Sequence, residues 1–424
     1  MVARNFVETN ANILYPQLDI GGEKSGITGM EFPLLNYLIY LLSQLFGYTH
    51  WYGRLINLVV TSLGLFFFHK LLSKFFTLEL SFCATLLLLF SVWFSYARKI
   101  MPDTFSVSLV IIGLYQAHGY LLENKNAFTA GFAFLLLLAG TLSKLPAAIL
   151  LPLIFPLILS ANRTKQVIMC LLVTTCAFIA YWYYFIWVPY LNTTFEFTHF
   201  FMGMPFAKGI RQISEQLPLF ASRFYHDALG YSGFPLVILG LVLAVRQKQK
   251  QLGWVLLLTL PLFVIIILKA GATFYNHDYY VIPFVPILSI FAANTLVAIP
   301  SPKWRYLIII VLSIETILTN NIDFYIHEEM AAIENLEPAL DRLGTRSDRI
   351  VINSGLVPTP MYFAHRRGWV TSNDSLQNPA FLSRLKIAQC KFVVILHKRF
   401  GRSIHLPLTT AAHTADFTIY QLNE

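Results

Sequence analysis

The sequence predicts an all-α polytopic membrane protein that ends in a small C-terminal α/β domain. Of its 424 residues, 56% are hydrophobic and only 12% are charged, whereas about a quarter of the residues of a soluble domain are charged. The apolar residues gather in long runs that stop near residue 320, and the composition after that point is mixed. Water is therefore not the main solvent for most of this chain.

Ten apolar runs have a spanning or near-spanning length. A helix that crosses a bilayer needs about 20 apolar residues, so several of these runs are short and we expect some of the helices to be broken. A shorter run, residues 33–46, is predicted to be an interfacial or re-entrant helix. The ten runs are residues 55–68, 78–96, 104–122, 128–142, 145–160, 167–187, 234–245, 252–268, 280–299 and 306–318.

Basic residues mark one side of the membrane. They follow every second apolar run, at residues 69–74, 125, 163–165, 246–250 and 303–305, as the positive-inside rule predicts for cytoplasmic loops. The net charge of +9 is thus a topology signal, and nucleic acid is excluded as a partner. We expect a multi-pass protein of the inner or plasma membrane, embedded in the lipid bilayer, with its longer polar loops and its C-terminal domain outside the cytoplasm.

Three consecutive regions follow from this pattern. Residues 1–54 form a first outer loop with interfacial helices, residues 55–320 a multi-span membrane domain and residues 321–424 a soluble extracytoplasmic domain. In the last region we expect one helix and three short strands. This domain serves either as a lid or recognition domain or as a stabilising cap. The expected helix is residues 328–343, and the strands are residues 349–353, 392–396 and 417–422.

Two charged residues stand at the start of predicted spans. Asp103 directly follows Pro102, so its carboxylate either caps the helix or serves a site at the outer membrane boundary. Arg54 opens the first clear span. It either anchors the helix end at the headgroups or binds a phosphate with its guanidinium fork.

Lys144 interrupts a nearly continuous apolar stretch, residues 128–160. An ammonium group near hydrocarbon costs a few kcal/mol. Either the chain turns at the outer surface, where Pro146 begins a new helix, or the lysine pairs with an anionic ligand.

A compact polar cluster, His277, Asp278, Tyr279 and Tyr280, precedes another span. Histidine moves protons or binds metals near neutral pH. The tyrosines either stack on a sugar or belong to the interfacial aromatic belt. The belt does not account for the His-Asp pair, so we predict that the cluster binds substrate.

Glu31 and His199 are the remaining candidates in the outer loops. One carboxylate and one imidazole would hold a divalent metal ion if the fold brought them together. No other cofactor is expected, since the sequence has no phosphate-binding glycine loop, no dinucleotide fingerprint and no HExxH motif.

The order of several short motifs resembles that of a known enzyme group. The likeness covers about residues 1–320. It is to the GT-C glycosyltransferases of the dolichyl-phosphate-mannose-protein mannosyltransferase and aminoarabinose (undecaprenyl-phosphate sugar) transferase group. The motifs are Val2–Phe6, Leu14–Pro16, Glu31–Leu34, Leu45–Gly47, Gly53–Leu55, Arg98–Asp103, Ser143–Pro146 and His277–Tyr280.

This resemblance implies a GT-C-like helical bundle and a glycosyltransferase. Such an enzyme moves a sugar from a polyprenyl-phosphate donor to a lipid, glycan or protein acceptor at the outer face, by an inverting mechanism. Glu31 and Asp103 match acidic positions of the group, although Phe32 replaces the lysine that often follows the first of them. His199 loosely matches a histidine that contacts metal in the aminoarabinose branch. A donor phosphate at the interface would bind Arg54 and Lys144, while a carboxylate base activates the acceptor hydroxyl.

One departure from the group concerns the start of the chain. These enzymes begin with a transmembrane helix and a catalytic aspartate just before the region that matches Val2–Phe6, whereas residue 1 here already lies in the first outer loop. The sequence therefore allows a second interpretation, a truncated, non-catalytic homologue. A third, a transporter or flippase of lipid-linked sugars, would show internal repeats or charged helices near the midplane, and no repeat is evident.

Overall fold

The computed structural model describes residues 1–325 and 328–422, so residues 326–327 and 423–424 of the predicted soluble domain lie outside the described residues. The chain forms two compact units. The membrane unit comprises Glu31–Ile186 and Phe201–Asp323, and the tail unit comprises Met1–Met30, Trp187–Phe200 and Phe324–Glu424.

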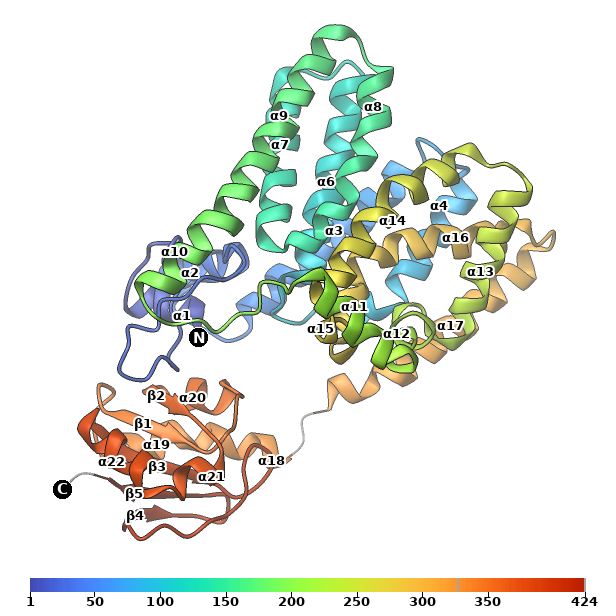
Figure 1. Ribbon diagram of the computed structural model, residues 1–424. Helices are drawn as coiled ribbons and strands as arrows, with labels where there is room; N and C mark the ends of the chain where they lie inside the picture. The colour runs from blue at the N-terminus through green and yellow to red at the C-terminus, as the bar shows by residue number, and fades with distance from the viewer. Residues whose placement is uncertain (326–327, 423–424) are drawn as a thin grey trace. The chain divides into compact units, whose positions relative to one another are not determined.

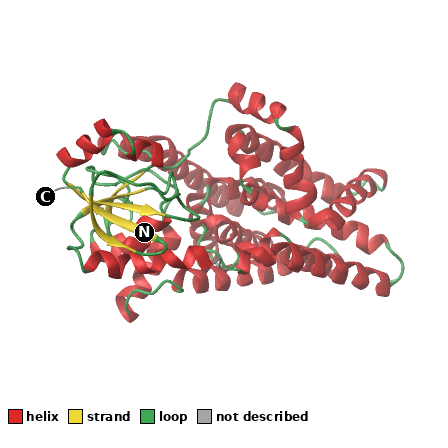
Figure 2. Cartoon of the chain, turned by 90° about the horizontal axis from the view of Figure 1, so that it is seen from below, coloured by secondary structure: helices red, strands yellow, loops and turns green. Residues whose placement is uncertain are grey.

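All ten predicted apolar runs are helical (Figures 1 and 2). Asparagine and threonine caps begin several of them: Asn126 accepts a hydrogen bond from the backbone N–H of Thr129, and Thr77 accepts one from that of Leu80. The helices of the membrane unit are α2 (Leu34–Phe46), α3 (Tyr52–Leu72), α4 (Leu78–Leu89), α5 (Val92–Tyr96), α6 (Pro102–Leu122), α7 (Ala127–Ser143), η1 (Leu145–Leu153), α8 (Ile154–Ser160), α9 (Arg163–Trp182), η2 (Tyr183–Trp187), α11 (Phe206–Glu215), α12 (Leu217–Ser222), η3 (Arg223–Ala228), α13 (Gly230–Arg246), α14 (Lys250–Ala270), α15 (Ala272–Asn276), η4 (Asp278–Phe284), α16 (Val285–Ala298), α17 (Pro302–Thr319) and η5 (Asn320–Phe324).

The sequence has ten apolar runs, but fewer helices than that are long enough to span a membrane. Within the described residues, five helices are long and apolar enough to cross a membrane, or six if the pair Leu217–Ala228 and Gly230–Arg246, bent by 96°, is one span. The other runs are shorter or broken. One such break is at Ser91, which caps α5 and so divides the run at 78–96 into two helices. The chain is a multi-pass membrane protein in which several helices are broken, as expected.

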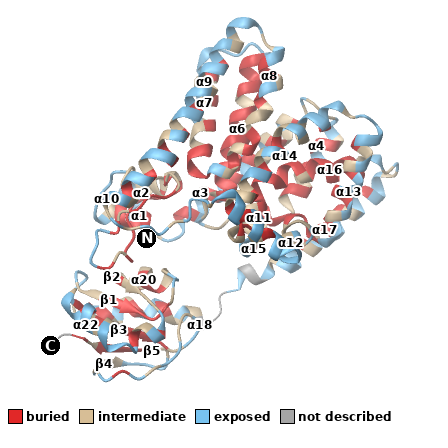
Figure 3. Ribbon diagram, viewed as in Figure 1, coloured by how far each residue is buried: buried red, intermediate tan, exposed pale blue. Residues whose placement is uncertain are grey.

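Two helices form the centre of the membrane unit. In the apolar 18-residue windows of α6 and of η4–α16, 83% of the residues are buried, whereas in that of α14 only 22% are buried (Figure 3). Helix α6 packs against α3 and α7, and α16 packs against α4 and α13. Small residues allow the close approach: a Cβ added at Gly140 of α7 would lie 2.7 Å from the Ser106 carbonyl oxygen of α6.

The tail unit contains the predicted small α/β domain. Its sheet has the order β2-β1-β3-β5-β4, with β1 parallel to β2 and β3, and β5 antiparallel to β3 and β4. Strands β1, β3 and β5 confirm the three predicted strands, whereas β2 and β4 were not predicted. The predicted helix at 328–343 is divided into α18, η6 and α19. The elements are α1 (Val2–Glu8), α10 (Val188–Thr194), α18 (Glu328–Ala331), η6 (Ala332–Asn335), α19 (Leu336–Asp341), β1 (Arg349–Ile352), α20 (Thr359–Ala364), β2 (Arg367–Val370), α21 (Asn373–Leu376), α22 (Pro379–Ile387), β3 (Cys390–Leu396), β4 (Thr409–His413) and β5 (Phe417–Gln421).

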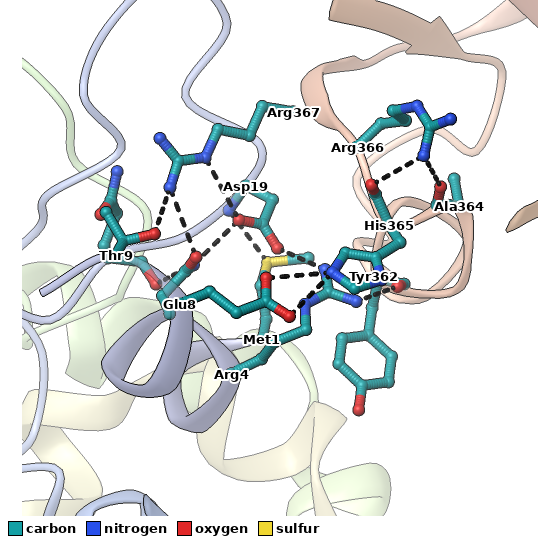
Figure 4. Close-up of polar contacts among 12 residues, drawn as sticks. Met1, Arg4, Glu8, Thr9, Asp19, Tyr362, Ala364, His365, Arg366 and Arg367 are labelled. Carbon is teal, nitrogen blue, oxygen red and sulfur yellow. Dashed lines mark hydrogen bonds and ion pairs between the residues drawn. The ribbon is translucent and has the colours of Figure 1, made fainter. Parts of the chain in front are cut away.

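Hydrogen bonds join the first thirty residues to this domain, so the structure groups the chain differently from the three consecutive regions of the sequence prediction. Arg4 forms a buried ion pair with Asp19 at 2.8 Å and also donates to the Tyr362 carbonyl oxygen at 2.8 Å (Figure 4). The backbone N–H of Gly368 in β2 donates to the Asp19 carbonyl oxygen at 2.9 Å. Asn192 joins the segment Trp187–Phe200 to the first thirty residues, since its Oδ1 accepts a hydrogen bond from the Gly29 N–H at 2.7 Å.

Candidate active site

A buried lysine with two carboxylates is the polar centre of the membrane unit. Lys144 Nζ donates a hydrogen bond to Glu31 Oε1 at 2.7 Å and lies 3.8 Å from Asp103 Oδ1. Lys144 is 9% exposed and Asp103 is 1% exposed. A buried ammonium group is stable only when it is paired, so the two carboxylates are what makes this position tolerable for Lys144.

A break between two helices places Lys144 in this cluster. Helix α7 ends at Ser143, Lys144 is extended with φ −160° and ψ 108°, and the 3-10 helix η1 begins at Leu145 with Pro146 in its first turn. Of the two interpretations of Lys144, the turn is present. The anionic partners found here are side chains of the same chain, which neither interpretation had named.

The backbone next to Glu31 is fixed to the end of α7. The Phe32 N–H donates to the Leu142 carbonyl oxygen at 2.9 Å, and the Tyr184 hydroxyl donates to the same oxygen at 2.7 Å. Burial alone would raise the pKa of Glu31, but the charge and the hydrogen bond of Lys144 outweigh it and lower that pKa below its usual value. Glu31 is therefore ionised at neutral pH.

Asp103 lies in the first turn of α6, but it is not the helix cap. The cap position is Met101, and no side chain caps this end. Asp103 Oδ2 is buried without a hydrogen-bond partner among the described residues. The capping interpretation of Asp103 is therefore wrong, because the carboxylate is directed at Lys144.

Asn57, which the sequence analysis did not single out, holds the loop before α6. It is fully buried in α3, and its Nδ2 donates to the Lys99 carbonyl oxygen at 2.7 Å and to the Tyr96 carbonyl oxygen at 3.0 Å. This loop leads directly into Asp103. A polar residue inside an apolar span is the signal that could have identified Asn57.

The His277 cluster lies against the same lysine. Lys144 Nζ is 5.6 Å from the ring centroid of Tyr279 and 5.7 Å from that of Tyr280, within the range of cation–π interactions. The rings of His277 and Tyr279 stack at 5.1 Å. Burial, together with other nearby charges, lowers the pKa of His277 although Asp278 opposes the shift.

Asp278 connects this cluster to the loop that Asn57 holds. Its Oδ1 accepts a hydrogen bond from the Tyr96 hydroxyl at 2.6 Å. Seven of the nine predicted site residues thus lie together: Glu31, Asp103, Lys144 and the four residues of the His277–Tyr280 cluster.

A cleft of about 130 Å³ opens beside these residues. Glu31, Lys144, Tyr280 and Lys269 form its polar lining, and Tyr184, on the π-helix η2, lies beside them. π-helical turns occur often at functional sites. The remaining wall is mainly apolar and includes Leu145, Phe185, Phe201, Met202 and Ile266. The cleft thus offers charged and apolar surfaces side by side.

Two predicted residues do not join this cluster. Arg54 is exposed in the first turn of α3 and does not line the cleft. His199 belongs to the tail unit, where burial lowers its pKa.

The residues around Glu31 do not fit a metal ion. Glu31 already accepts a hydrogen bond from an ammonium group, and among residues 1–325 and 328–422 no three His, Cys, Asp or Glu side chains are grouped as metal ligands.

Comparison with known proteins agrees with this architecture. Residues 31–187 match the family model described as dolichyl-phosphate-mannose-protein mannosyltransferase. Comparison with the sequences of curated proteins finds no match.

Solved structures share the fold over nearly the whole chain. ArnT from Cupriavidus metallidurans in the apo state is 12% identical with a TM-score of 0.60, over 99% of this chain and 92% of that chain. The same protein bound to undecaprenyl phosphate has a TM-score of 0.58 at 11% identity, with the same coverage. The oligosaccharyltransferase of Archaeoglobus fulgidus in the apo form is 13% identical with a TM-score of 0.56, over 93% of this chain and 64% of that chain. The chain therefore has the GT-C fold, as the order of its motifs indicated, and residues 31–187 carry the sequence pattern of the dolichyl-phosphate-mannose-protein mannosyltransferase family.

Proposed function

We propose that this protein is a membrane glycosyltransferase that moves a sugar from a polyprenyl-phosphate donor to an acceptor hydroxyl. The observation that carries the proposal is the cleft, in which Lys144, Glu31 and Lys269 lie beside apolar side chains within a membrane unit of GT-C fold. A lipid-linked sugar has the same two chemical parts, an anionic polar head and an apolar chain. Fold relatives support this choice of donor, since ArnT was solved with undecaprenyl phosphate and AglB from Archaeoglobus fulgidus with dolichol-phosphate.

The residues of the cleft suit a single displacement at the sugar. The bond between the anomeric carbon and the phosphate oxygen breaks, the phosphate leaves with the bonding electrons, and the acceptor oxygen forms the new bond with inversion. A carboxylate must take the acceptor proton. Among the described residues that line the cleft, Glu31 is the carboxylate, and its lowered pKa keeps it ionised. We propose that Glu31 accepts the acceptor proton and that Asp103 holds Lys144 in position.

The remaining parts of the site have proposed roles as well. His277, Asp278, Tyr279 and Tyr280 would bind the sugar, because stacked aromatic rings present a flat apolar face to it. The alternation of basic loops favours an outer-face reaction, with the C-terminal domain extracytoplasmic.

Transfer from a labelled donor tests the proposal. The full chain, reconstituted in vesicles, is given radiolabelled polyprenyl-phosphate sugars together with a membrane extract that supplies acceptors. We expect label to move from the lipid donor to an acceptor, and Glu31→Gln to lower the rate by about a hundredfold or more, the usual contribution of a general base. Lys208→Gln, which changes an exposed lysine of α11, should leave the rate unchanged. Absence of transfer from every lipid-linked donor, or equal rates for Glu31→Gln and the unmodified chain, would overturn it.

A further inference from the structure

We infer that Lys269 is the cation that binds the donor phosphate. This inference deepens the proposed function and rests on it. Lys144 was the lysine that the sequence pointed to, but the structure gives the two lysines of the cleft different surroundings.

Lys144 is already neutralised by its neighbours. Its ammonium group lies 2.7 Å from one carboxylate and 3.8 Å from another, so a phosphate beside it would also meet the charge of Glu31. Lys144 therefore serves chiefly to hold the two carboxylates in place.

Lys269 lines the same cleft without such partners. It is half-buried at the end of α14, and among the described residues no carboxylate lies within ion-pairing distance of it. Its Nζ lies 5.2 Å from the ring centroid of Phe206. An ammonium group that lies over an aromatic ring, lines a cleft and has no anionic side chain beside it can bind an anionic ligand.

The backbone around Lys269 is well fixed. The Met204 N–H donates to the Lys269 carbonyl oxygen at 2.9 Å. A Cβ added at Gly203 would lie 3.4 Å from Lys269 Cε, so the loop before α11 packs directly on this side chain. Lys269 is therefore a positioned side chain and not only a basic residue at a helix end.

Charge and shape both match one class of ligand. Of the two lysines that line the cleft, Lys144 is paired with carboxylates, whereas Lys269 has no carboxylate partner among the described residues. The charge of Lys269 is therefore available to the phosphate of a lipid ligand. Phe201 and Met202 line the same cleft and are 42% and 39% exposed. They would cover the first isoprene units of a polyprenyl chain whose phosphate is at Lys269.

Binding of polyprenyl phosphate to the full chain tests this assignment. The protein is placed in lipid nanodiscs, and the affinity for undecaprenyl phosphate is measured for the unmodified chain, Lys269→Gln, Lys269→Arg and the control Lys208→Gln. The Lys269→Gln variant should bind undecaprenyl phosphate about tenfold more weakly than the unmodified chain, because it loses one charge-assisted contact. Lys269→Arg and Lys208→Gln should bind as the unmodified chain does, and the uncharged polyprenol should bind all four equally.

Three outcomes would overturn the assignment. If Lys269→Gln binds undecaprenyl phosphate as tightly as the unmodified chain does, Lys269 is not the phosphate-binding cation. The proposed function still stands in that case if the Lys269→Gln variant transfers sugar. Equal displacement of the ligand by phosphatidylglycerol or by inorganic phosphate would make the cleft a general anion site. An unmodified chain that neither binds the lipid phosphate nor transfers sugar would remove the proposed function together with this inference.

Discussion

A single buried lysine shows how this chain reconciles charge with a membrane interior. A buried Lys144 without a partner would destabilise the fold, but Glu31 and Asp103 lie beside it. Removal of any one of these charges would leave another buried charge unpaired, and this would lower the free energy of unfolding. The sequence could identify all three residues, because charged groups at apolar boundaries are conspicuous. It could not show that they contact one another, since Glu31 and Lys144 are 113 positions apart.

Replacing the lysine tests the balance of charge. Lys144→Met should lower the free energy of unfolding by about 3–5 kcal/mol, because it leaves buried carboxylates without a counter-charge. The double variant Lys144→Met, Glu31→Gln should recover part of this loss, since it removes one of those charges. Unfolding of the purified protein by detergent titration measures both. Identical losses in the two variants would show that Lys144 acts through packing and not through charge.

The pH dependence of stability follows from Glu31. Because its folded-state pKa lies below the usual value of 4.5, its ion pair contributes stability that is fully present above pH 4.5 and is lost as the pH falls through the lower, folded pKa. The difference in unfolding free energy between the unmodified chain and Glu31→Gln should therefore shrink on acidification below pH 4.5. A difference that grows on acidification would contradict the pairing with Lys144.

At the scale of elements, the sequence predicts what is apolar and misses what is held by hydrogen bonds. The ten apolar runs follow from composition because they are long and apolar. The strands β1, β3 and β5 follow from it because most of their residues are buried and apolar. Strands β2 and β4 are the two edges of the sheet, and β4 has little buried surface, so neither has an apolar alternation. Asn57 was missed for a related reason, since its role depends on carbonyl groups about 40 positions away.

Two buried asparagines separate stability from function. Asn57→Ala should lower the unfolding free energy by about 1–3 kcal/mol, because it leaves buried carbonyl groups unsatisfied, and it should slow sugar transfer by releasing the loop before Asp103. Asn294→Ala is the matched control, since Asn294 is also buried and donates to the Gly240 carbonyl oxygen at 3.2 Å. It should be destabilised to a similar extent but retain transfer. Equal loss of transfer in both variants would deny Asn57 a positioning role.

At the scale of the whole molecule, the chain is organised by contacts that the sequence order hides. The first thirty residues belong with the C-terminal domain and not with the first spans. Gly368 of β2 exchanges backbone hydrogen bonds with Asp19 and Gly22, so this early segment protects an otherwise open sheet edge. Edge strands of this kind become recognisable only once their partner is known.

The buried pair at this junction should matter more than the exposed one. Asp19→Ala leaves Arg4 unpaired in a buried position and should destabilise the tail unit by about 3–5 kcal/mol. Glu23→Ala removes an exposed contact to Arg384 at 3.4 Å and should cost about 1 kcal/mol or less. The rate of limited proteolysis within residues 328–422 reports both. Equal proteolysis of the two variants would argue against Asp19 as the link between the segments.

The central claim is that the cleft at Lys144 and Lys269 holds a polyprenyl phosphate, and photocrosslinking tests it most directly. A polyprenyl phosphate with a photoreactive group in its first isoprene unit is bound to the full chain and irradiated, and the labelled peptides are sequenced. The account predicts labels at Leu145, Phe185 and the pair Phe201 and Met202, all cleft-lining residues, and their loss when excess unlabelled polyprenyl phosphate is added. Labels confined to the apolar cavity of about 180 Å³ that Phe68, Trp254 and Ile287 line, or spread evenly over the lipid-facing helices, would contradict it.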